Sequence, residues 1–287
     1  MGKFMPRFTN QAQLRYGNSV TNSNIAVGEI LEVLSMTKTA VRSQYDPNGH
    51  ITYVISILNS GTLPVNGLTV TDNLGAYTSG LTTLTPLNYL AGSVKYYING
   101  TLQAAPAVTA GPPLSITGIS VPAGGNAVIV YETQVNEFAP LATEAAITNT
   151  ATADGAGITA ITAEETVGVL SAPLLAITKS VSPVPVTENG TLTYTFRIQN
   201  SGNTAADAAT GVVVTDTFNP RLSNLTATLN GTTLTPTTDY TYNEATGEFA
   251  TVAGRITVPA ASFVTDPATG TISTDPGVTT LTISGTI

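Results

Sequence analysis

The sequence predicts an all-β protein: two tandem β-sandwiches, the C-terminal one incomplete, preceded by an N-terminal β-hairpin extension. Three observations lead to this fold class. Thr, Val, Ile, Ala and Gly dominate a chain of 287 residues of which only 10% are charged, a composition typical of strands. Short β-branched runs alternate with turn-forming clusters of Asn, Gly, Pro and Asp. The pattern of residues 36–170 also returns in part over residues 177–287.

The two copies of the pattern carry strand-like runs in matching places. Each opens on a run containing Thr-Lys, continues after a turn with a longer alternating run that ends in Asn-Ser-Gly, and then has a run ending in Val-Thr-Asp. The matching pairs are residues 36–40 and 177–181, 51–61 and 192–202, and 68–72 and 212–216. An Asn-Gly turn later separates two further runs in each copy. Short strands at this spacing favour sandwiches of the immunoglobulin-like type.

A motif near the N-terminus has a counterpart in mid-chain. Residues 8–12 (FTNQA) are similar to residues 147–151 (ITNTA), and each is followed by a Gly-containing turn, a second strand-like run and a Thr-Lys strand. The mid-chain copy closes the domain that begins near Met36. The N-terminal copy has no domain before it, and the C-terminal domain has no such copy after it.

Three segments follow from this arrangement. We expect a donor hairpin or extension over residues 1–35, a complete immunoglobulin-like domain over 36–170, and an incomplete one over 171–287. The alternative is that residues 1–34 are a disordered tail and that the second domain is a shorter variant.

The spacing of the motif opposes that alternative. Asn10 precedes Lys38 by nearly the same number of residues as Asn149 precedes Lys179, and a disordered tail has no reason to keep that spacing. A sandwich that lacks a strand leaves unpaired backbone groups and an open apolar groove. We therefore expect head-to-tail assembly, in which residues 8–34 of one copy complete the C-terminal domain of the next.

Composition excludes several classes of partner and site. A net charge of −8, with ten Lys and Arg scattered along the chain, argues against a nucleic-acid partner. No apolar run of 18 or more residues predicts a membrane span, and the N-terminal residues have no apolar segment that would mark a secretory signal. Cys is absent and His50 is the single histidine, so no disulfide, cofactor or metal site is expected.

The ordered set of motifs resembles a known family. A Thr-Lys opening, a Gly followed by Thr-Tyr, Asn-Ser-Gly, Val-Thr-Asp and a closing Thr-Asn-Thr-Ala-Thr are similar to the bacterial surface repeat called domain of unknown function eleven, an immunoglobulin-like module. The resemblance covers about 36–170 once and 177–287 in part. It implies a structural role outside the cell or on a cell or spore surface, and it supplies no activity. The permuted ends depart from ordinary members.

Six polar residues stand at candidate reactive positions. Strand periodicity places each of them on the face that carries its apolar neighbours. They are Lys38, Asp72 and Asn149 in the first domain, Lys179 and Asp216 in the second, and Asn10 near the N-terminus. In a low-dielectric core a Lys amine loses its proton more readily and an Asp tends to keep one. A neutral amine can then attack an Asn carboxamide polarised by a protonated Asp, which forms an isopeptide bond and releases ammonia.

This chemistry resembles the autocatalytic cross-links of Gram-positive pilin and adhesin domains. The resemblance implies a bond between Lys38 and Asn149, with Asp72 as the catalytic acid. It also implies a bond between Lys179 and Asn10 of a neighbouring subunit, with Asp216 as the acid. The plain alternative is an ion pair near the rim of each sandwich. Lysine is rare in this chain, and two of its four lysines stand at equivalent positions of the two copies. This favours the cross-link.

The function expected from these features is that of a structural subunit of a self-assembling extracellular or surface filament. One rival is a monomeric adhesin or glycan-binding module, which would need a cluster of exposed aromatic side chains. Trp is absent, and Tyr96 and Tyr97 alternate across a strand. The other rival is an autonomous enzyme, for which no phosphate loop, nucleophile elbow or paired-carboxylate cleft can be named. No small-molecule substrate is identified.

Overall fold

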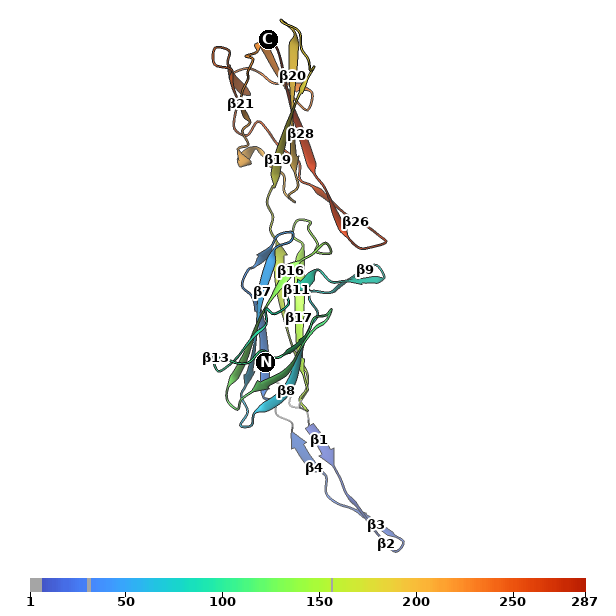
Figure 1. Cartoon of the computed structure of the whole chain (residues 1–287). Helices are drawn as coiled ribbons and strands as arrows, with labels where there is room; N and C mark the ends of the chain where they lie inside the picture. Colours follow the sequence, from blue (N-terminus) through green and yellow to red (C-terminus); the bar gives the residue numbers. More distant parts are fainter. Residues whose placement is uncertain (1–6, 30–31, 156) are drawn as a thin grey trace.

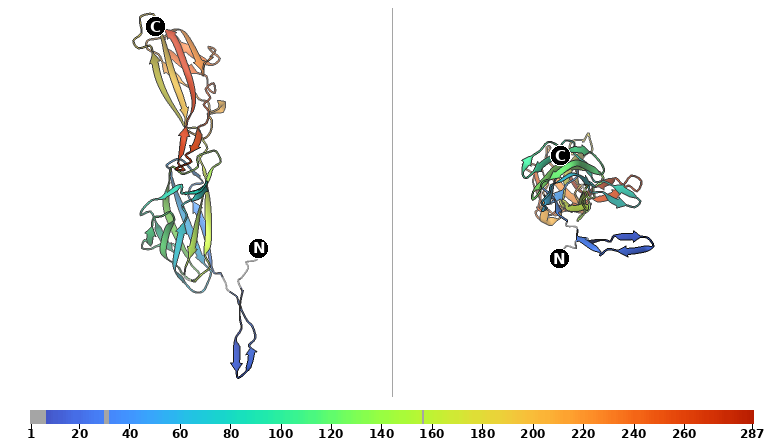
Figure 2. Two further views of the ribbon diagram at one scale, coloured as in Figure 1. Left: turned by 90° about the vertical axis from the view of Figure 1, so that its right-hand side faces the viewer. Right: turned by 90° about the horizontal axis from the view of Figure 1, so that it is seen from below.

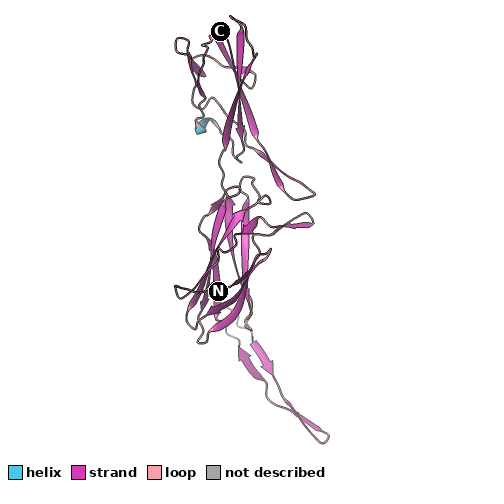
Figure 3. Ribbon diagram, viewed as in Figure 1, coloured by secondary structure: helices cyan, strands magenta, loops and turns pink. Residues whose placement is uncertain are grey.

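A computed structural model describes residues 7–29, 32–155 and 157–287 of the chain. The described part is almost entirely β-strand, with one short 3-10 helix, η1 (Ala208–Thr210) (Figure 3). Two sandwiches follow one another along an elongated molecule, and a hairpin projects beyond the far end of the first (Figures 1 and 2). The predicted fold class, two tandem sandwiches of which the second is incomplete, with an N-terminal hairpin, is confirmed.

The N-terminal hairpin is a two-stranded ribbon in two parts. Strand β1 (Arg7–Asn10) pairs with β4 (Ala26–Glu29), and β2 (Gln13–Tyr16) pairs with β3 (Ser19–Asn22). Every side chain from residue 8 to residue 27 is exposed. The exposed apolar ones are Phe8, Leu14, Tyr16, Val20, Ile25 and Val27. A two-stranded hairpin with such side chains in water is marginally stable by itself, so this ribbon has an unburied apolar surface.

The first sandwich consists of two sheets and a side hairpin. One sheet has the spatial order β13 (Thr101–Leu102), β12 (Lys95–Ile98), β16 (Asn126–Val135), β7 (His50–Asn59) and β5 (Leu34–Ala40), with β11 (Leu87–Tyr89) also on β16. The other has the order β14 (Ala107–Thr109), β15 (Leu114–Val121), β8 (Val65–Asp72), β17 (Ala146–Asp154), β18 (Ile161–Val169) and β6 (Gln44–Tyr45). Strands β9 (Tyr77–Ser79) and β10 (Thr82–Leu84) form the side hairpin.

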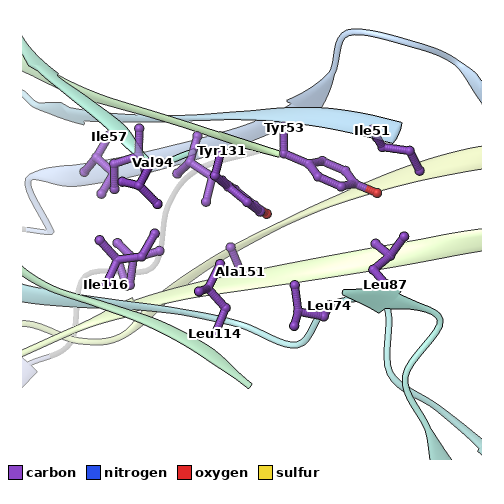
Figure 4. Packing of buried hydrophobic residues seen from close by; sticks show 14 of the residues in the cluster. Ile51, Tyr53, Ile57, Leu74, Leu87, Val94, Leu114, Ile116, Tyr131 and Ala151 are labelled. Carbon is purple, nitrogen blue, oxygen red and sulfur yellow. The ribbon is translucent and has the colours of Figure 1, made fainter. Parts of the chain in front are cut away.

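Strict alternation builds the core of this sandwich. Every second residue of β7, from Ile51 to Ile57, is fully buried, and the intervening residues are half-buried or exposed. The same period runs through β16, where Ile129 and Tyr131 point inward. Figure 4 shows Ile57, Tyr53 and Tyr131 of this sheet facing Leu114, Ile116 and Ala151 of the opposite sheet. Packing of the two inner faces fixes the register of both sheets.

The second sandwich has fewer strands. Its larger sheet has the order β19 (Leu175–Ser182), β20 (Thr191–Asn200), β28 (Gly277–Thr286), β22 (Ser223–Leu229) and β23 (Thr232–Thr233). Its smaller sheet has the order β21 (Thr215–Thr217), β25 (Glu248–Thr251) and β24 (Tyr240–Asn243). A hairpin of β26 (Ser262–Thr265) and β27 (Ile272–Asp275) extends towards the first sandwich (Figure 1).

The second sandwich has no counterpart of β17 and β18 among the described residues. In the first sandwich β8 lies between β15 and β17, whereas its counterpart β21 pairs only with β25. The strand expected over residues 212–216 is correspondingly shorter, beginning at Thr215, because its preceding residues have no neighbouring strand to pair with on that side. Every residue of β19, the edge strand, is exposed. One long side of the second sandwich is therefore open.

Polar contacts fix the joint between the two sandwiches. The side-chain amide of Asn203 donates to the backbone oxygens of Leu141 and Leu170, and its oxygen accepts from the Ala172 N–H. The β27 residue Ile272 donates its N–H to the Glu137 carbonyl of the first sandwich. These contacts hold the sandwiches end to end.

Candidate cross-link sites

Lys38 and Asp72 form a buried ion pair inside the first sandwich. Lys38 comes from the edge strand β5, and Asp72 from the end of β8 in the opposite sheet. The Lys38 Nζ lies 2.6 Å from Asp72 Oδ2, and the exposed fractions of the two side chains are 0% and 1%. The same ammonium lies 4.8 Å from the centre of the Tyr53 ring. A charge pair this far from water is retained only where other hydrogen bonds satisfy it.

Asp72 accepts further hydrogen bonds on both carboxylate oxygens. The Tyr131 hydroxyl donates to Oδ2 over 2.5 Å, and the Leu74 N–H donates to Oδ1 over 2.9 Å. Tyr131 is fully buried and its ring stacks on that of Tyr53, with ring centres 5.6 Å apart. Asp72 is thus held in one orientation, with Lys38 and Tyr131 both against Oδ2.

Asn149 completes the cluster from β17. Its side chain is fully buried and its Oδ1 accepts from the Gly75 N–H over 3.2 Å. Its Nδ2 donates to the Tyr131 hydroxyl over 3.4 Å. Gly75 has a φ of +72°, and a Cβ there would lie 2.5 Å from Ile147 Cγ2, so glycine suits both the turn and the close approach. The structure therefore places Lys38, Asp72 and Asn149 in one buried group.

Burial sets the protonation of this group. Desolvation lowers the pKa of Lys38 to about 8, although the attraction of Asp72 opposes the shift. Burial also raises the pKa of Tyr131 far above its usual range, and the negative charge of Asp72 adds to the effect. The lysine can therefore give up a proton under mild conditions, whereas the tyrosine keeps its own.

The second sandwich holds the same ion pair in an open setting. Lys179 of β19 donates to Asp216 of β21, but the two side chains are 41% and 18% exposed. Three aromatic rings surround the ammonium. Its distances to the ring centres are 4.7 Å for Tyr194, 5.4 Å for Phe196 and 5.3 Å for Phe218. Cation–π attraction and the Asp216 carboxylate together hold the Lys179 ammonium against the second sandwich at its open side.

One residue of the first site has no equivalent in the second. Tyr131 pairs across the sheet with Tyr53, and the equivalent cross-strand pair in the second sandwich is Ile283 with Tyr194. An isoleucine thus stands where the first sandwich has a tyrosine hydroxyl.

Asn10 lies apart from both ion pairs. Its side chain is exposed on β1, in the hairpin that projects away from the second sandwich (Figure 1). Within one chain the structure brings together Lys179 and Asp216, but not Asn10.

Tyr131 is the member of the first site that the sequence analysis missed. The alternation of residues 128–135 is the signal that could have placed it inward with Asp72.

The described residues offer no metal site or membrane-spanning helix. No group of three or more His, Cys, Asp or Glu side chains in residues 7–29, 32–155 and 157–287 could hold a metal ion. Over the same ranges no helix has the length and apolar character needed to cross a bilayer.

The chain was compared with known proteins by sequence and by structure. No protein-family model and no curated protein matches it, so the motif resemblance to the bacterial surface repeat gains no support from sequence. Among solved structures it is similar to the major pilin subunit BcpA of Bacillus cereus, with 13% identity, a TM-score of 0.38, and coverage of 94% of this chain and 73% of that one.

Two further solved structures are similar. One is the pilus backbone RrgB of Streptococcus pneumoniae, with 13% identity, a TM-score of 0.35, and coverage of 85% of this chain and 55% of that one. The other is the collagen-binding domain of a Staphylococcus aureus adhesin, with 14% identity, a TM-score of 0.29, and coverage of 47% of this chain and 95% of that one. Likenesses this distant say nothing about what this chain does.

Proposed function

We propose that this protein is a structural subunit of an extracellular or cell-surface filament, which polymerises head to tail by donating its N-terminal hairpin. The observation that carries the proposal is a difference between the two sandwiches. The first has Lys38, Asp72 and Asn149 in one buried cluster. The second has the equivalent Lys179 and Asp216 partly exposed on its open side, and the hairpin carries an Asn in the same local motif. The surface location rests on the motif resemblance.

The register of the hairpin supports its role as the missing pair of strands. In β1 and β4, Phe8 lies opposite Gly28 and Asn10 lies opposite Ala26. In β17 and β18, Ile147 lies opposite Val167 and Asn149 lies opposite Glu165. These paired residues have the same separations along the chain in both hairpins. A ribbon of this register can therefore replace β17 and β18 without a shift of side chains to the wrong face.

Apolar surfaces on both parts provide the driving force. On β19 the side chains of Ile177 and Val181 are 53% and 39% exposed, whereas the equivalent Met36 and Ala40 are partly buried in the first sandwich. The hairpin exposes six large apolar side chains of its own. Docking would remove both surfaces from water. This burial would stabilise the complex by roughly 25 cal/mol for each Å² of apolar surface buried.

Geometry makes this assembly directional. The hairpin and the second sandwich lie at opposite ends of the elongated chain (Figures 1 and 2). The open side of one subunit's second sandwich thus accepts the hairpin of another copy, and repetition of the same contact gives a linear polymer.

The covalent part of the proposal has two bonds. Within the first sandwich the Lys38 amine attacks the side-chain carbonyl carbon of Asn149. A new amide bond forms, the bond from that carbon to Nδ2 breaks, and ammonia leaves. At each junction Lys179 reacts in the same way with Asn10 of the incoming hairpin, beside Asp216.

Removal of the hairpin tests the assembly. Protein lacking residues 1–29, which leaves β5 and its buried Leu34 intact, should stay soluble but monomeric by size-exclusion chromatography and should show no fibres by electron microscopy, whereas the full chain should give both polymers and fibres. The matched control deletes residues 80–83, the exposed tip of the side hairpin β9–β10, which lies outside the proposed contact. Fibres of unchanged morphology from the protein without residues 1–29 would rule out donation by this segment.

A further inference from the structure

We propose that Tyr131 is a catalytic residue of the cross-link in the first sandwich, where its hydroxyl relays a proton from Asp72 to the departing nitrogen of Asn149. This inference rests on the proposed bond between Lys38 and Asn149, and it assigns the path by which the proton of Asp72 reaches the departing nitrogen.

The hydroxyl lies between the acid and the leaving group. It donates to Asp72 Oδ2 over 2.5 Å and accepts from Asn149 Nδ2 over 3.4 Å. Among the described residues, the hydrogen bond that Asn149 Nδ2 donates goes to Tyr131 and not to Asp72. A proton held by the carboxyl therefore reaches the amide nitrogen through the phenol.

The ring is fixed in this position. Tyr131 comes from the middle of β16, is fully buried, and stacks on Tyr53 between the two sheets (Figure 4). Because the pKa of Tyr131 is raised, the phenol stays protonated and can donate as soon as it receives another proton.

The reaction starts from the form with a neutral Lys38 amine and a protonated Asp72. The amine nitrogen attacks the Asn149 side-chain carbon, and the carbonyl oxygen takes up negative charge beside the Gly75 N–H. Asp72 passes its proton to the Tyr131 oxygen while Tyr131 passes its own proton to Nδ2. The attacking nitrogen returns one proton to Asp72. The carbon–Nδ2 bond then breaks, the carbonyl re-forms and neutral ammonia leaves, so Tyr131 and Asp72 end as they began.

The second sandwich provides a natural contrast. Ile283 stands at the position of Tyr131, so the Lys179 site has no equivalent hydroxyl beside Asp216. The junction bond would therefore form without this relay and more slowly than the bond inside the first sandwich.

The test follows bond formation in the full chain with Tyr131→Phe. Chains are made in a short pulse of cell-free synthesis at low temperature, and the loss of one ammonia is followed by intact-mass measurement under denaturing conditions. We expect a rate lower by about 100-fold, the usual scale of a lost general acid. The control is Tyr96→Phe, which removes a buried hydroxyl from the same sandwich, bonded to Ser120 and away from the cluster. Its rate should equal that of wild type.

A second variant changes the residue while keeping its hydroxyl. A 3-fluorotyrosine introduced at position 131 retains the hydroxyl and the ring, so the bond should form at a rate close to that of wild type. A Tyr131→Phe protein that reacts as fast as wild type, or a fluorinated protein that reacts as slowly as Tyr131→Phe, would overturn the relay alone. A wild-type chain that never loses ammonia would overturn the bond and the relay together.

Discussion

Lys179 holds in the second sandwich the place that Lys38 holds in the first, yet its side chain is 41% exposed, whereas that of Lys38 is fully buried. Each lysine is paired with an aspartate from the opposite sheet. The difference lies in β17 and β18, which cover Lys38 and have no counterpart over Lys179 in the part of the chain that the structure describes. Covering the second lysine would therefore bury its ion pair like that of the first, with Ile283 in place of the Tyr131 hydroxyl.

The bond inside the first sandwich should be visible as a missing ammonia. Wild-type protein should have a mass lower than its sequence mass by one ammonia, and Lys38→Ala or Asp72→Ala should restore the calculated mass because the nucleophile or the acid is gone. Lys38→Ala should also destabilise the protein by about 3–5 kcal/mol, because it removes a cross-link that closes a loop of about 110 residues and so restricts the unfolded chain. Intact-mass spectrometry and denaturant unfolding measure the two effects.

The matched control for this change is Lys95→Ala, which removes an exposed lysine from β12 of the same sandwich. Its mass should remain one ammonia below the calculated value. A wild-type mass equal to the sequence mass would reduce the cluster to a hydrogen-bonded ion pair.

The rate of this reaction should fall as the pH rises past about 8. Attack needs one proton shared by the pair, in the form of a neutral Lys38 amine and a protonated Asp72. Transfer of the proton from lysine to aspartate does not change the number of protons bound to the pair. The fraction of pairs in this reactive form is therefore independent of pH until the pair loses its shared proton. Because the pKa of Lys38 is about 8, that loss occurs near this pH. A time course of ammonia loss across pH 6–10 measures the profile, and a rate that kept rising above pH 8 would mean that the amine attacks without help from an acid.

Asn10 should control the covalent joint but not the fibre. Wild-type filaments boiled in detergent should run as a ladder of multimers, because each junction is an amide bond. Asn10→Ala should collapse to monomer on the same gel while still forming fibres, since backbone pairing by β1 is unchanged. Asn22→Ala, on the same hairpin, is the control and should keep the ladder. Wild-type fibres that run wholly as monomer would eliminate the junction bond and leave strand donation standing.

A charge on β19, at the open side of the second sandwich, should prevent assembly itself. Ile177 is 53% exposed on β19, and Ile177→Asp would place an unpaired carboxylate under the docked hairpin, which costs several kcal/mol and should weaken assembly at least 100-fold. Leu102→Asp is the control, because Leu102 is 58% exposed on the edge strand β13 of the first sandwich. The amount of polymer that sediments, measured over a range of protein concentrations, gives the assembly affinity of each variant. Equal polymerisation of the two variants would place the contact elsewhere.

Strand periodicity is sufficient to predict which of these polar residues face inward. Alternate residues of a strand share a face, so the inward positions of Lys38, Asp72 and Asn149 follow from the apolar residues two places away. Tyr131 lies on such a face too, but an inward tyrosine is ordinarily part of the packing. Its role depends on which polar groups the opposite sheet brings to its hydroxyl, and this is a property of the tertiary structure.

Two other features could not be read from one sequence. The strand expected over residues 212–216 is short because a strand needs a neighbour, and pattern alone does not tell whether that neighbour is in the same chain. The reach of β26–β27 to Glu137 depends on the angle between the sandwiches, which no local pattern encodes. The fold class was predictable because it depends on the two-residue periodicity of the strands and on the turn-forming residues between them.

An electron cryomicroscopy map of the assembled filament tests the proposed assembly most directly. Head-to-tail donation predicts that β1 to β4 of one subunit lie along β19 and β21 of the next, with Asn10 beside Lys179 and the hairpin buried over its full length. A map in which each hairpin stays exposed, or packs on a different face of its neighbour, would contradict it.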